Sequence, residues 1–458
     1  MRLGDVRHQK TAKAELAQGD RGEASKERRS GEASTAASGN ERSGTDRLME
    51  QVVEARNVLG ALKRVVQNKG GPGIDGMRVE DLTAYLRANW RRLRSELLTG
   101  TYQPEPVKRQ EIPKSGGGVR VLGIPTALDR FIQQAILQVL QPRFDPTFSK
   151  HSYGFRPGRS AHDAIRAAQH YIQEGRQWVV DLDLEKFFDR VNHDVLMSRL
   201  AKRIEDKRLL KLVRAYLNAG IMVNGVVIER PEGTPQGGPL SPLLANVLLD
   251  EVDKELEKRG HAFCRYADDC NVYVHSERAG QRVMAHMREL LTRLRLKVNE
   301  GKSAVARPWD RTFLGFSFRL DRNGKVKRCV APQSLEKMKE RVRDITARNG
   351  GRSIKAVIAE LRRYLLGWGG YFRLTEVARQ LRGLDVWVRR RLRILQLKQW
   401  KRGTTVFKKL GALGLDRGPA AKVAAQSRRY ARVSRMPAIF VALPDKLFDT
   451  RGVPRLAR

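Results

Sequence analysis

The chain has 458 residues, of which 89 are Lys or Arg and 50 are Asp or Glu, giving a formal net charge of +39. That length is enough for several domains. So large a positive charge calls for a polyanionic partner, and nucleic acid is the first candidate. The alternative that charge alone leaves open is a basic protein of a ribosome or of a membrane surface.

Cysteine usage and hydropathy bear on where the chain works. Its three cysteines, Cys264, Cys270 and Cys329, form no closely spaced pair, so neither a disulfide framework nor a zinc site is supported. We therefore expect a reducing, cytoplasmic setting. The N-terminus is polar and shows no signal peptide. No apolar run approaches the roughly 20 residues needed to span a bilayer, so no membrane partner is expected.

The first 46 residues differ in composition from the rest. Met1–Asp46 has no Phe, Trp or Tyr and carries 9 basic and 8 acidic residues. Such a segment cannot bury enough apolar surface to offset the entropy lost on ordering. We therefore predict a disordered leader over residues 1–46.

The middle of the chain mixes helical and strand patterns without a regular alternation. Apolar spacing predicts a helix over Arg47–Gln67. Two strand-like runs around a glycine-rich turn predict a hairpin of Lys108–Pro113 and Val119–Ile124. Further helices are expected over Leu128–Leu140, Leu240–Leu256 and Val283–Leu296, and a strand over Trp178–Leu184. This mixture favours an α+β core.

Beyond Pro332 the apolar spacing becomes helical and the positive charge rises. Arg311–Arg458 holds 37 basic and 10 acidic residues, a net charge of +27. One helix carries four closely spaced arginines: Arg389, Arg390, Arg391 and Arg393. A charged helix face is often merely solvated, but the acids here are too few to pair with the basic residues locally. Nucleic-acid contact is therefore the favoured interpretation.

Two adjacent carboxylates, Asp268 and Asp269, separate the strand-like runs Ala262–Tyr266 and Cys270–Val274. A strand–turn–strand would hold both acids at a hairpin tip. Hard cations such as Mg²⁺ favour carboxylate oxygens, and two such ions about 3.5–4 Å apart can support phosphoryl transfer. An ordinary two-Asp turn is the bland alternative.

Two further segments carry candidate chemistry. Asp183 stands at the end of a predicted strand, and Asp181 shares its face, so spacing alone cannot choose between them. Thr234–Pro242 is a glycine-rich entry to a helix that would allow a nucleotide or template close to the backbone. Lys302 could approach a triphosphate, although by default it is an exposed lysine.

The order of these elements is more specific than any one of them. A basic hairpin is followed by DLEKFFD, TPQGGPLSP, YADD, NEGKS and FLGF. This order resembles reverse transcriptases, most closely the proteins encoded by bacterial group II introns. Ile124–Thr126 and Ser152–Pro157 extend the resemblance, which covers roughly Leu48–Arg402.

The resemblance implies a role for individual residues. It assigns the metal-binding acids to Asp183, Asp268 and Asp269, with two Mg²⁺ per active site, and it selects Asp183 over Asp181. Phe188 would lie below the sugar and exclude a 2′-hydroxyl by sterics. The other nucleotide contacts implied are Lys114 and Arg120 at the triphosphate, Gln236 in the nucleotide pocket, and Lys302 near the leaving pyrophosphate.

The resemblance also implies an α+β right-hand polymerase of fingers and palm, followed by an all-helical thumb or maturase domain. We expect an N-terminal extension and fingers over 47–176, a palm over 177–325 partly interleaved with them, and a thumb over 326–402. A basic tail, 403–458, is a candidate DNA-binding region. Leu366–Phe372 and Trp387–Arg393 look like the thumb of intron-encoded proteins. With no HNH nuclease signature, the chain is similar to the compact class C type.

The function implied is an RNA-directed DNA polymerase that binds its group II intron RNA and assists its splicing. It would copy that RNA from dNTPs at a primed DNA target during intron mobility. One alternative is a maturase that binds RNA without polymerase activity. Another is a retron or diversity-generating reverse transcriptase, which the sequences at Trp368–Phe372 and Trp387–Arg393 argue against.

Overall fold

A computed structural model describes residues 47–113, 118–223, 226–228, 232–234 and 237–457. The leader predicted over residues 1–46 lies outside the described residues, as do Lys114 and Gln236. None of the helices in this described part of the chain combines the length and hydropathy that crossing a bilayer requires.

The first part of the described chain joins helices to a small sheet. The strands β1 (Val107–Pro113) and β2 (Val119–Ile124) form the predicted antiparallel hairpin. The edge of β1 pairs in parallel with β4 (Ile221–Val223), which pairs with β5 (Val226–Ile228). The helices of this part are α1 (Leu48–Val52), α2 (Ala55–Asn68), α3 (Leu82–Thr99), α4 (Ala127–Phe144), α6 (His193–Ala201) and α7 (Lys207–Asn218).

The helix predicted over Arg47–Gln67 is interrupted. The chain leaves the helical conformation at Val53 and at Glu54, whose ψ is 138°. The side chain of Asn57 donates to the carbonyl of Val52 at 2.9 Å, so a terminal carbonyl of α1 is satisfied by the next helix. Apolar spacing does not reveal this break, because it counts Leu59, which is exposed on α2.

A second sheet, of order β6-β7-β3-β8, carries the predicted acids. Its strands are β3 (Trp178–Leu182), β6 (Ala262–Tyr266), β7 (Asp269–Val274) and β8 (Ala304–Ala306). All neighbouring pairs are antiparallel, which confirms the strand predicted before Asp183 and the hairpin predicted around Asp268.

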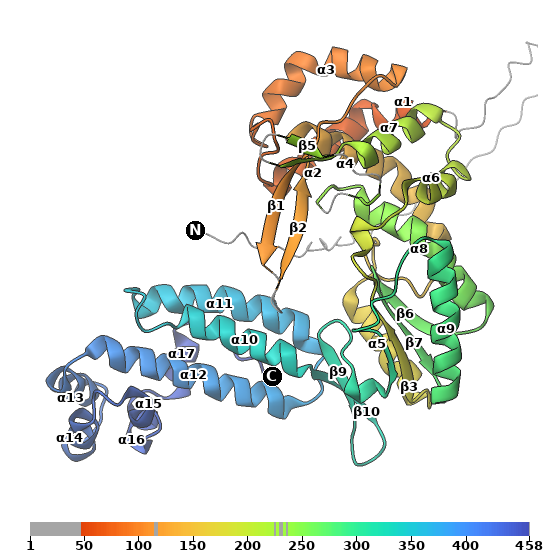
Figure 1. Cartoon of the computed structure of the whole chain (residues 1–458). Helices are drawn as coiled ribbons and strands as arrows, with labels where there is room; N and C mark the ends of the chain where they lie inside the picture. The colour runs from red at the N-terminus through yellow and green to blue at the C-terminus, as the bar shows by residue number, and fades with distance from the viewer. Residues whose placement is uncertain (1–46, 114–117, 224–225, 229–231, 235–236, 458) are drawn as a thin grey trace, which may run out of the picture. The chain divides into compact units, whose positions relative to one another are not determined.

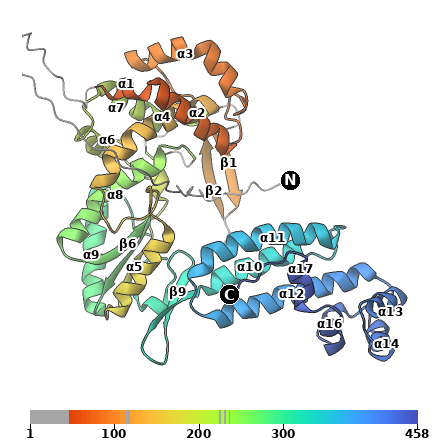
Figure 2. The ribbon, with the colours of Figure 1, turned by 180° about the vertical axis from the view of Figure 1, so that it is seen from behind.

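Helices cover both faces of this sheet. The side chains of Val180 and Val272 belong to one apolar cluster with α8 (Ser241–Lys258) and α9 (Glu277–Arg293). Those of Val179 and Tyr273 belong to another cluster with α5 (Ala161–Gln173), whose side of the sheet is seen in Figure 2. Because the sheet is buried on both faces, its strand ends are the places where polar groups can reach solvent.

The last part of the described chain is helical after the hairpin of β9 (Phe316–Leu320) and β10 (Val326–Val330). The helices α10 (Pro332–Ile345), α11 (Ile354–Tyr371) and α12 (Ala378–Trp400) lie side by side, which confirms the helical prediction (Figure 1). Residues 403–457 also fold into helices with buried apolar side chains. These are α13 (Gly403–Ala412), α14 (Arg417–Ala425), α15 (Tyr430–Val433), α16 (Pro437–Ala442) and α17 (Asp445–Thr450).

Candidate active site and nucleic-acid interface

The turn between β6 and β7 places two carboxylates at the tip of a tight hairpin. Tyr266 pairs with Asp269, so only Ala267 and Asp268 connect the strands. Ala267 has a φ of 59°, in the left-handed region that two-residue hairpin turns require. A non-glycine residue thus holds a conformation that the surrounding structure must support.

The neighbouring strand brings Asp183 to the same end of the sheet. Leu182 of β3 pairs with Cys270 of β7, so the residue after Leu182 lies beside the start of β7. The backbone of Asp183 is held by Ser303, whose hydroxyl accepts from its N–H at 3.0 Å, and by Asn299, whose N–H donates to its carbonyl at 2.9 Å. The structure therefore brings the three predicted acids together.

The carboxylates in this cluster influence one another. Desolvation, with the charges of Asp268, Asp183 and Asp181, raises the pKa of Asp269 to about 7. Desolvation and Asp183 also raise the pKa of Asp268, although Arg120 and Lys302 partly oppose this. Asp269 as a whole residue is exposed, so we attribute much of its raised pKa to the neighbouring carboxylates.

Asp183 and Asp181 have different partners. The carboxylate of Asp183 lies 3.2 Å from Nζ of Lys302, and it accepts from Nδ2 of Asn299 at 3.0 Å. Asp181 lies inside β3 and forms an ion pair of 2.6 Å with Arg311. The pKa of Asp181 is raised by burial, and Arg311 acts against that rise. The partner of Asp181 is therefore a bound arginine, whereas the partner of Asp183 is a largely exposed lysine whose side chain can turn away.

The donor chemistry of Asp183, Asp268 and Asp269 suits a hard divalent cation, since all three are carboxylates whose mutual repulsion a cation would relieve. Within the described residues, no three acidic, His or Cys side chains already form a complete metal-ligand set. The three carboxylates therefore fit a divalent cation in the type of donor atom and in charge. Substrate and water oxygens would have to complete the coordination.

The described residues predicted to bind nucleotide are distributed around this end of the sheet. Arg120 lies exposed on β2, and its positive charge acts to lower the pKa of Asp268. Phe188 is half-buried, packs edge-on against Phe187 at 5.0 Å between ring centroids, and accepts from the Thr234 N–H through its backbone carbonyl. A third, Lys302, forms the ion pair with Asp183 given above, and the remaining two, Lys114 and Gln236, are outside the described residues.

Sequence reasoning missed Asn299 and Arg311, which contact the acids directly. Asn299 opens the NEGKS motif, in which the sequence points only to Lys302. Arg311 has no local signal, because its partner lies 130 residues earlier in the chain. The pairing of β3 with β8 brings these segments together.

The four arginines predicted to bind RNA divide into two kinds. Arg389 and Arg393 are each only 1% exposed. Arg389 forms an ion pair of 2.5 Å with Asp449 and one of 3.2 Å with Asp385, and Arg393 pairs with Asp445 at 2.5 Å. Direct RNA contact by Arg389 and Arg393 does not fit this structure, because their guanidinium groups join α12 to α17.

Arg390 and Arg391 are half-buried and have no acidic partner in the described part of the chain. Burial and the nearby charge of Arg435 lower the pKa of Arg390. Burial, Arg348 and Arg343 lower that of Arg391. Like charges without a neutralising acid are the arrangement expected where a polyanion binds.

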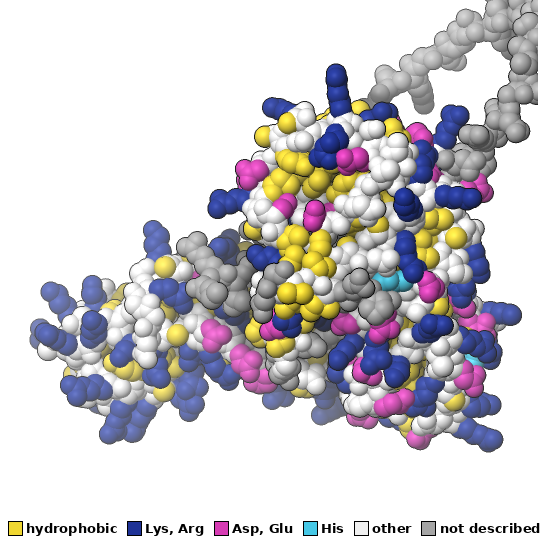
Figure 3. All heavy atoms as spheres, turned by 45° about the horizontal axis from the view of Figure 1, so that its top comes forward, with side chains coloured by type: hydrophobic (Ala, Val, Ile, Leu, Met, Phe, Trp, Pro, Cys, Tyr) yellow, Lys and Arg dark blue, Asp and Glu magenta, His cyan; other side chains and the backbone are white. Residues whose placement is uncertain are grey.

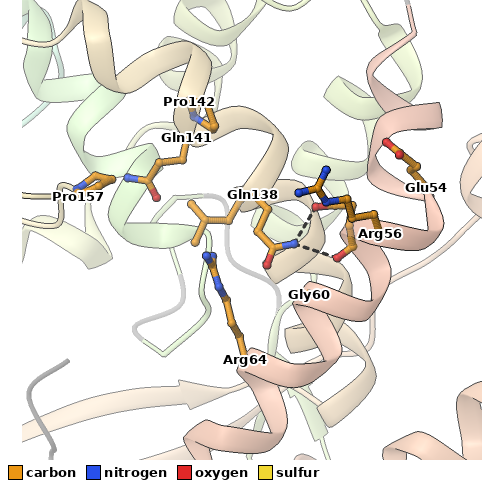
Figure 4. Close-up of a pocket in the computed structure, with 10 residues that line it drawn as sticks. Glu54, Arg56, Gly60, Arg64, Gln138, Gln141, Pro142 and Pro157 are labelled. Atoms are coloured by element: carbon orange, nitrogen blue, oxygen red, sulfur yellow. Dashed lines mark hydrogen bonds between the residues drawn. The ribbon is translucent and has the colours of Figure 1, made fainter. Parts of the chain in front are cut away.

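A separate polar groove of about 490 Å³ lies between α2 and α4 (Figure 4). Gln138 of α4 spans it by donating to Asn57 of α2 at 2.7 and 2.9 Å, and Arg56 and Arg64 line its sides. None of the described residues predicted to act in catalysis lines this groove.

Comparison with known proteins identifies two domains in the chain. Residues 112–318 match the family of reverse transcriptases (RNA-dependent DNA polymerases). Residues 335–411 match the group II intron maturase-specific domain. The chain thus combines a reverse transcriptase domain with a group II intron maturase-specific domain. The match to the first family contains Asp181, Asp183, Asp268 and Asp269, and the match to the second contains the four arginines of α12.

Individual relatives agree with this assignment. Protein YkfC of Escherichia coli is 40% identical over 220 residues, which are 46% of this chain and 58% of YkfC. The group II intron-encoded protein LtrA of Lactococcus lactis is 35% identical over 195 residues, 42% of this chain and 32% of LtrA. The chain thus matches less than two thirds of the length of either relative.

The burial of Arg389 leads to a prediction about stability. Arg389→Gln should lower the free energy of unfolding by about 3 kcal/mol, because it leaves Asp385 and Asp449 without their buried cation. Chemical denaturation followed by circular dichroism would measure the change. Arg382→Gln, at an exposed position on the same helix, is the matched control and should change stability little. Equal stability of the two variants would contradict the structural role of Arg389.

Proposed function

We propose that this protein is an RNA-directed DNA polymerase that binds a group II intron RNA, assists its splicing and copies it into DNA from a primer at a DNA target. The observation that carries the proposal is the convergence of Asp183, Asp268 and Asp269 at one sheet end, inside a reverse transcriptase domain that precedes a maturase-specific domain. The decisive experiment is primer extension on an RNA template.

In this proposal Asp183, Asp268 and Asp269 hold two Mg²⁺. Bound there, Mg²⁺ would activate the primer 3′-hydroxyl and stabilise the charge that develops on the leaving pyrophosphate. The residues of the chain supply position and charge. Arg120 and Lys302 are exposed cations beside the acids, so both can turn toward a triphosphate that enters the site.

The resemblance adds two contacts that we carry over as part of the proposal. Lys114 would hold the triphosphate together with Arg120, and Gln236 would contact the nucleotide. Phe188 would set the sugar preference, because its half-buried ring follows the proposed metal ligand Asp183 by five residues. Its packing on Phe187 restricts how far the ring can move aside.

The three acids and Asp181 give the sharpest test of catalysis. Asp183→Asn and Asp269→Ala should each lower primer extension by more than about 100-fold, beyond the loss seen when only a supporting residue is removed. Asp181→Asn should lose no more than about tenfold, since Arg311 can still donate to an amide oxygen. RNA affinity, measured by filter binding, should stay near wild type in all three. Full extension by Asp269→Ala would refute the assignment, and an inactive wild type that still promotes splicing would indicate a maturase without polymerase activity.

Sugar choice can be tested at Phe188. Phe188→Ala should open space for a 2′-hydroxyl and reduce discrimination against ribonucleotides by about 10- to 100-fold. The measurement is the ratio of kcat/KM for a dNTP and the matching ribonucleotide. Phe187→Leu, a change at the neighbouring buried ring, controls for loosened packing. If both variants keep the wild-type ratio, Phe188 is only part of the core.

We propose that intron RNA is bound by a cluster of three arginines: Arg343 of α10, Arg348 just beyond α10, and Arg391 of α12. Arg343 and Arg348 are exposed, and the Arg343 guanidinium lies over the Trp387 ring. Arg391 donates to Oγ1 of Thr346 at 3.0 Å, which fixes its guanidinium beside the other two. On the visible face of the helical part, basic side chains predominate (Figure 3). We also propose that the basic helices of residues 403–457 contact the DNA target.

Replacing Arg343, Arg348 and Arg391 together by Gln should weaken intron RNA binding and flatten its dependence on salt. For every phosphate group that the variant no longer neutralises, the slope of log affinity against log salt should fall by about 0.7–0.9. Protein-assisted splicing should fall, while extension of a short preannealed primer should suffer less. Fluorescence anisotropy over a salt series would measure the slope.

The matched control removes three charges from α9. Arg278, Arg282 and Arg293 are all exposed there, and their triple Gln variant loses the same net charge. If both triple variants change the slope equally, general charge explains binding and the cluster is not a specific RNA site.

A further inference from the structure

Behind the hairpin tip lies a buried guanidinium whose donors are all engaged. Arg265 of β6 is 1% exposed. Its Nε and Nη2 donate to the two carboxylate oxygens of Asp253 at 2.7 and 2.6 Å. Its Nη1 donates to Asn246 Oδ1 and to the Ala267 carbonyl, both at 2.9 Å, and its Nη2 also donates to Ser152 Oγ at 2.8 Å. Five hydrogen bonds thus hold one side chain in a single orientation.

The bond to Ala267 acts on the catalytic turn itself. The carbonyl of Ala267 belongs to the peptide that joins Ala267 to Asp268. By binding this oxygen, Arg265 fixes the plane of the peptide from which Asp268 projects. It also supports Ala267 in its positive-φ conformation, which a non-glycine residue does not hold readily on its own.

The backbone of Gly154 also lies close against the turn. A Cβ added to Gly154 would lie 2.3 Å from the N of Ala267 and 2.9 Å from the carbonyl carbon of Tyr266. The carbonyl of Gly154 accepts from Nδ2 of Asn246 at 2.9 Å. Asn246 therefore bridges the two supports, since its amide bonds Gly154 on one side and Arg265 on the other.

We infer that Arg265 and Asn246 are positioning residues for polymerisation: with Gly154 they clamp the Ala267–Asp268 turn and so aim Asp268 and Asp269. This inference rests on the proposed function. The segments that meet here come from three separate parts of the chain: Ser152–Pro157, α8 and β6. None of these residues touches the reacting atoms.

The support acts through geometry and not through charge. Asp253 is fully buried and neutralises Arg265, so the pair carries no net charge toward the tip. The cations that lower the pKa of Asp268 are Arg120 and Lys302. If the network were purely structural, breaking it would lower stability. It would not change turnover by the molecules that remain folded.

The test compares Asn246→Ala and Gly154→Ala with Cys264→Ala. Cys264 is equally buried on β6, but its side chain points to α5, where its thiol donates to the Ala164 carbonyl. The Cys264→Ala change should cost stability and leave turnover per folded molecule at the wild-type value. Asn246→Asp keeps the acceptor for Arg265 and loses the donor for Gly154, so it should fall between wild type and Asn246→Ala.

We expect Asn246→Ala and Gly154→Ala to lower kcat at saturating Mg²⁺ by about 10- to 100-fold and to leave the KM for dNTP nearly unchanged. Binding of Mn²⁺, counted by electron paramagnetic resonance of the free ion without substrate, should weaken by about tenfold. Wild-type kcat and Mn²⁺ affinity in folded Asn246→Ala would overturn the inference. So would an equal loss in Cys264→Ala.

The two proposals fail in different ways. If the wild type does not extend a primer, the proposed polymerase function fails, while the Mn²⁺ measurement still tests whether the network aims the acids. If the wild type extends a primer and the variants match it, the function stands and the positioning role is refuted.

Discussion

Repulsion among carboxylates is the constraint on which the rest of this structure depends. Asp181, Asp183, Asp268 and Asp269 meet at one end of a buried sheet, and desolvation with mutual repulsion raises the pKa of three of them. Such a cluster would relax apart unless the backbone beneath it were rigid. Four antiparallel strands, covered by helices on both faces, provide that rigidity.

The two cations that pair with these carboxylates, Arg311 and Lys302, differ in how firmly they are held. Arg311 is bound to Asp181 by two nitrogens and also donates to the Lys302 carbonyl, so it is fixed. The Lys302 side chain is 69% exposed and touches Asp183 only at its tip. An exposed ion pair of this kind contributes little to stability, so breaking the contact between Lys302 and Asp183 would cost little, as our proposal for triphosphate binding requires.

The sequence contained enough to predict the strand before Asp183, the hairpin around Asp268 and the helical character beyond Pro332, because all three rest on local periodicity. It could not distinguish buried arginines from exposed ones. In hindsight a signal exists: Asp385, Arg389 and Arg393 follow one another at four-residue spacing, and Asp445 and Asp449 repeat that spacing. Two helices with matching stripes of opposite charge can pair residue by residue, as Arg389–Asp449 and Arg393–Asp445 do. Only the tertiary structure shows that these stripes face each other.

Arginine therefore serves this chain in two ways that its composition cannot separate. A net charge of +39 suggests that arginines are there for nucleic acid, yet Arg265, Arg389 and Arg393 are among the largest fully buried side chains. Each of these three is neutralised by a nearby aspartate, so it adds directional hydrogen bonds without adding to the external field. In our proposals, buried arginines therefore fix local geometry, and exposed arginines attract the polyanion. A change that removes surface charge can weaken RNA binding and leave the geometry of the hairpin tip intact, whereas loss of a buried arginine alters geometry first.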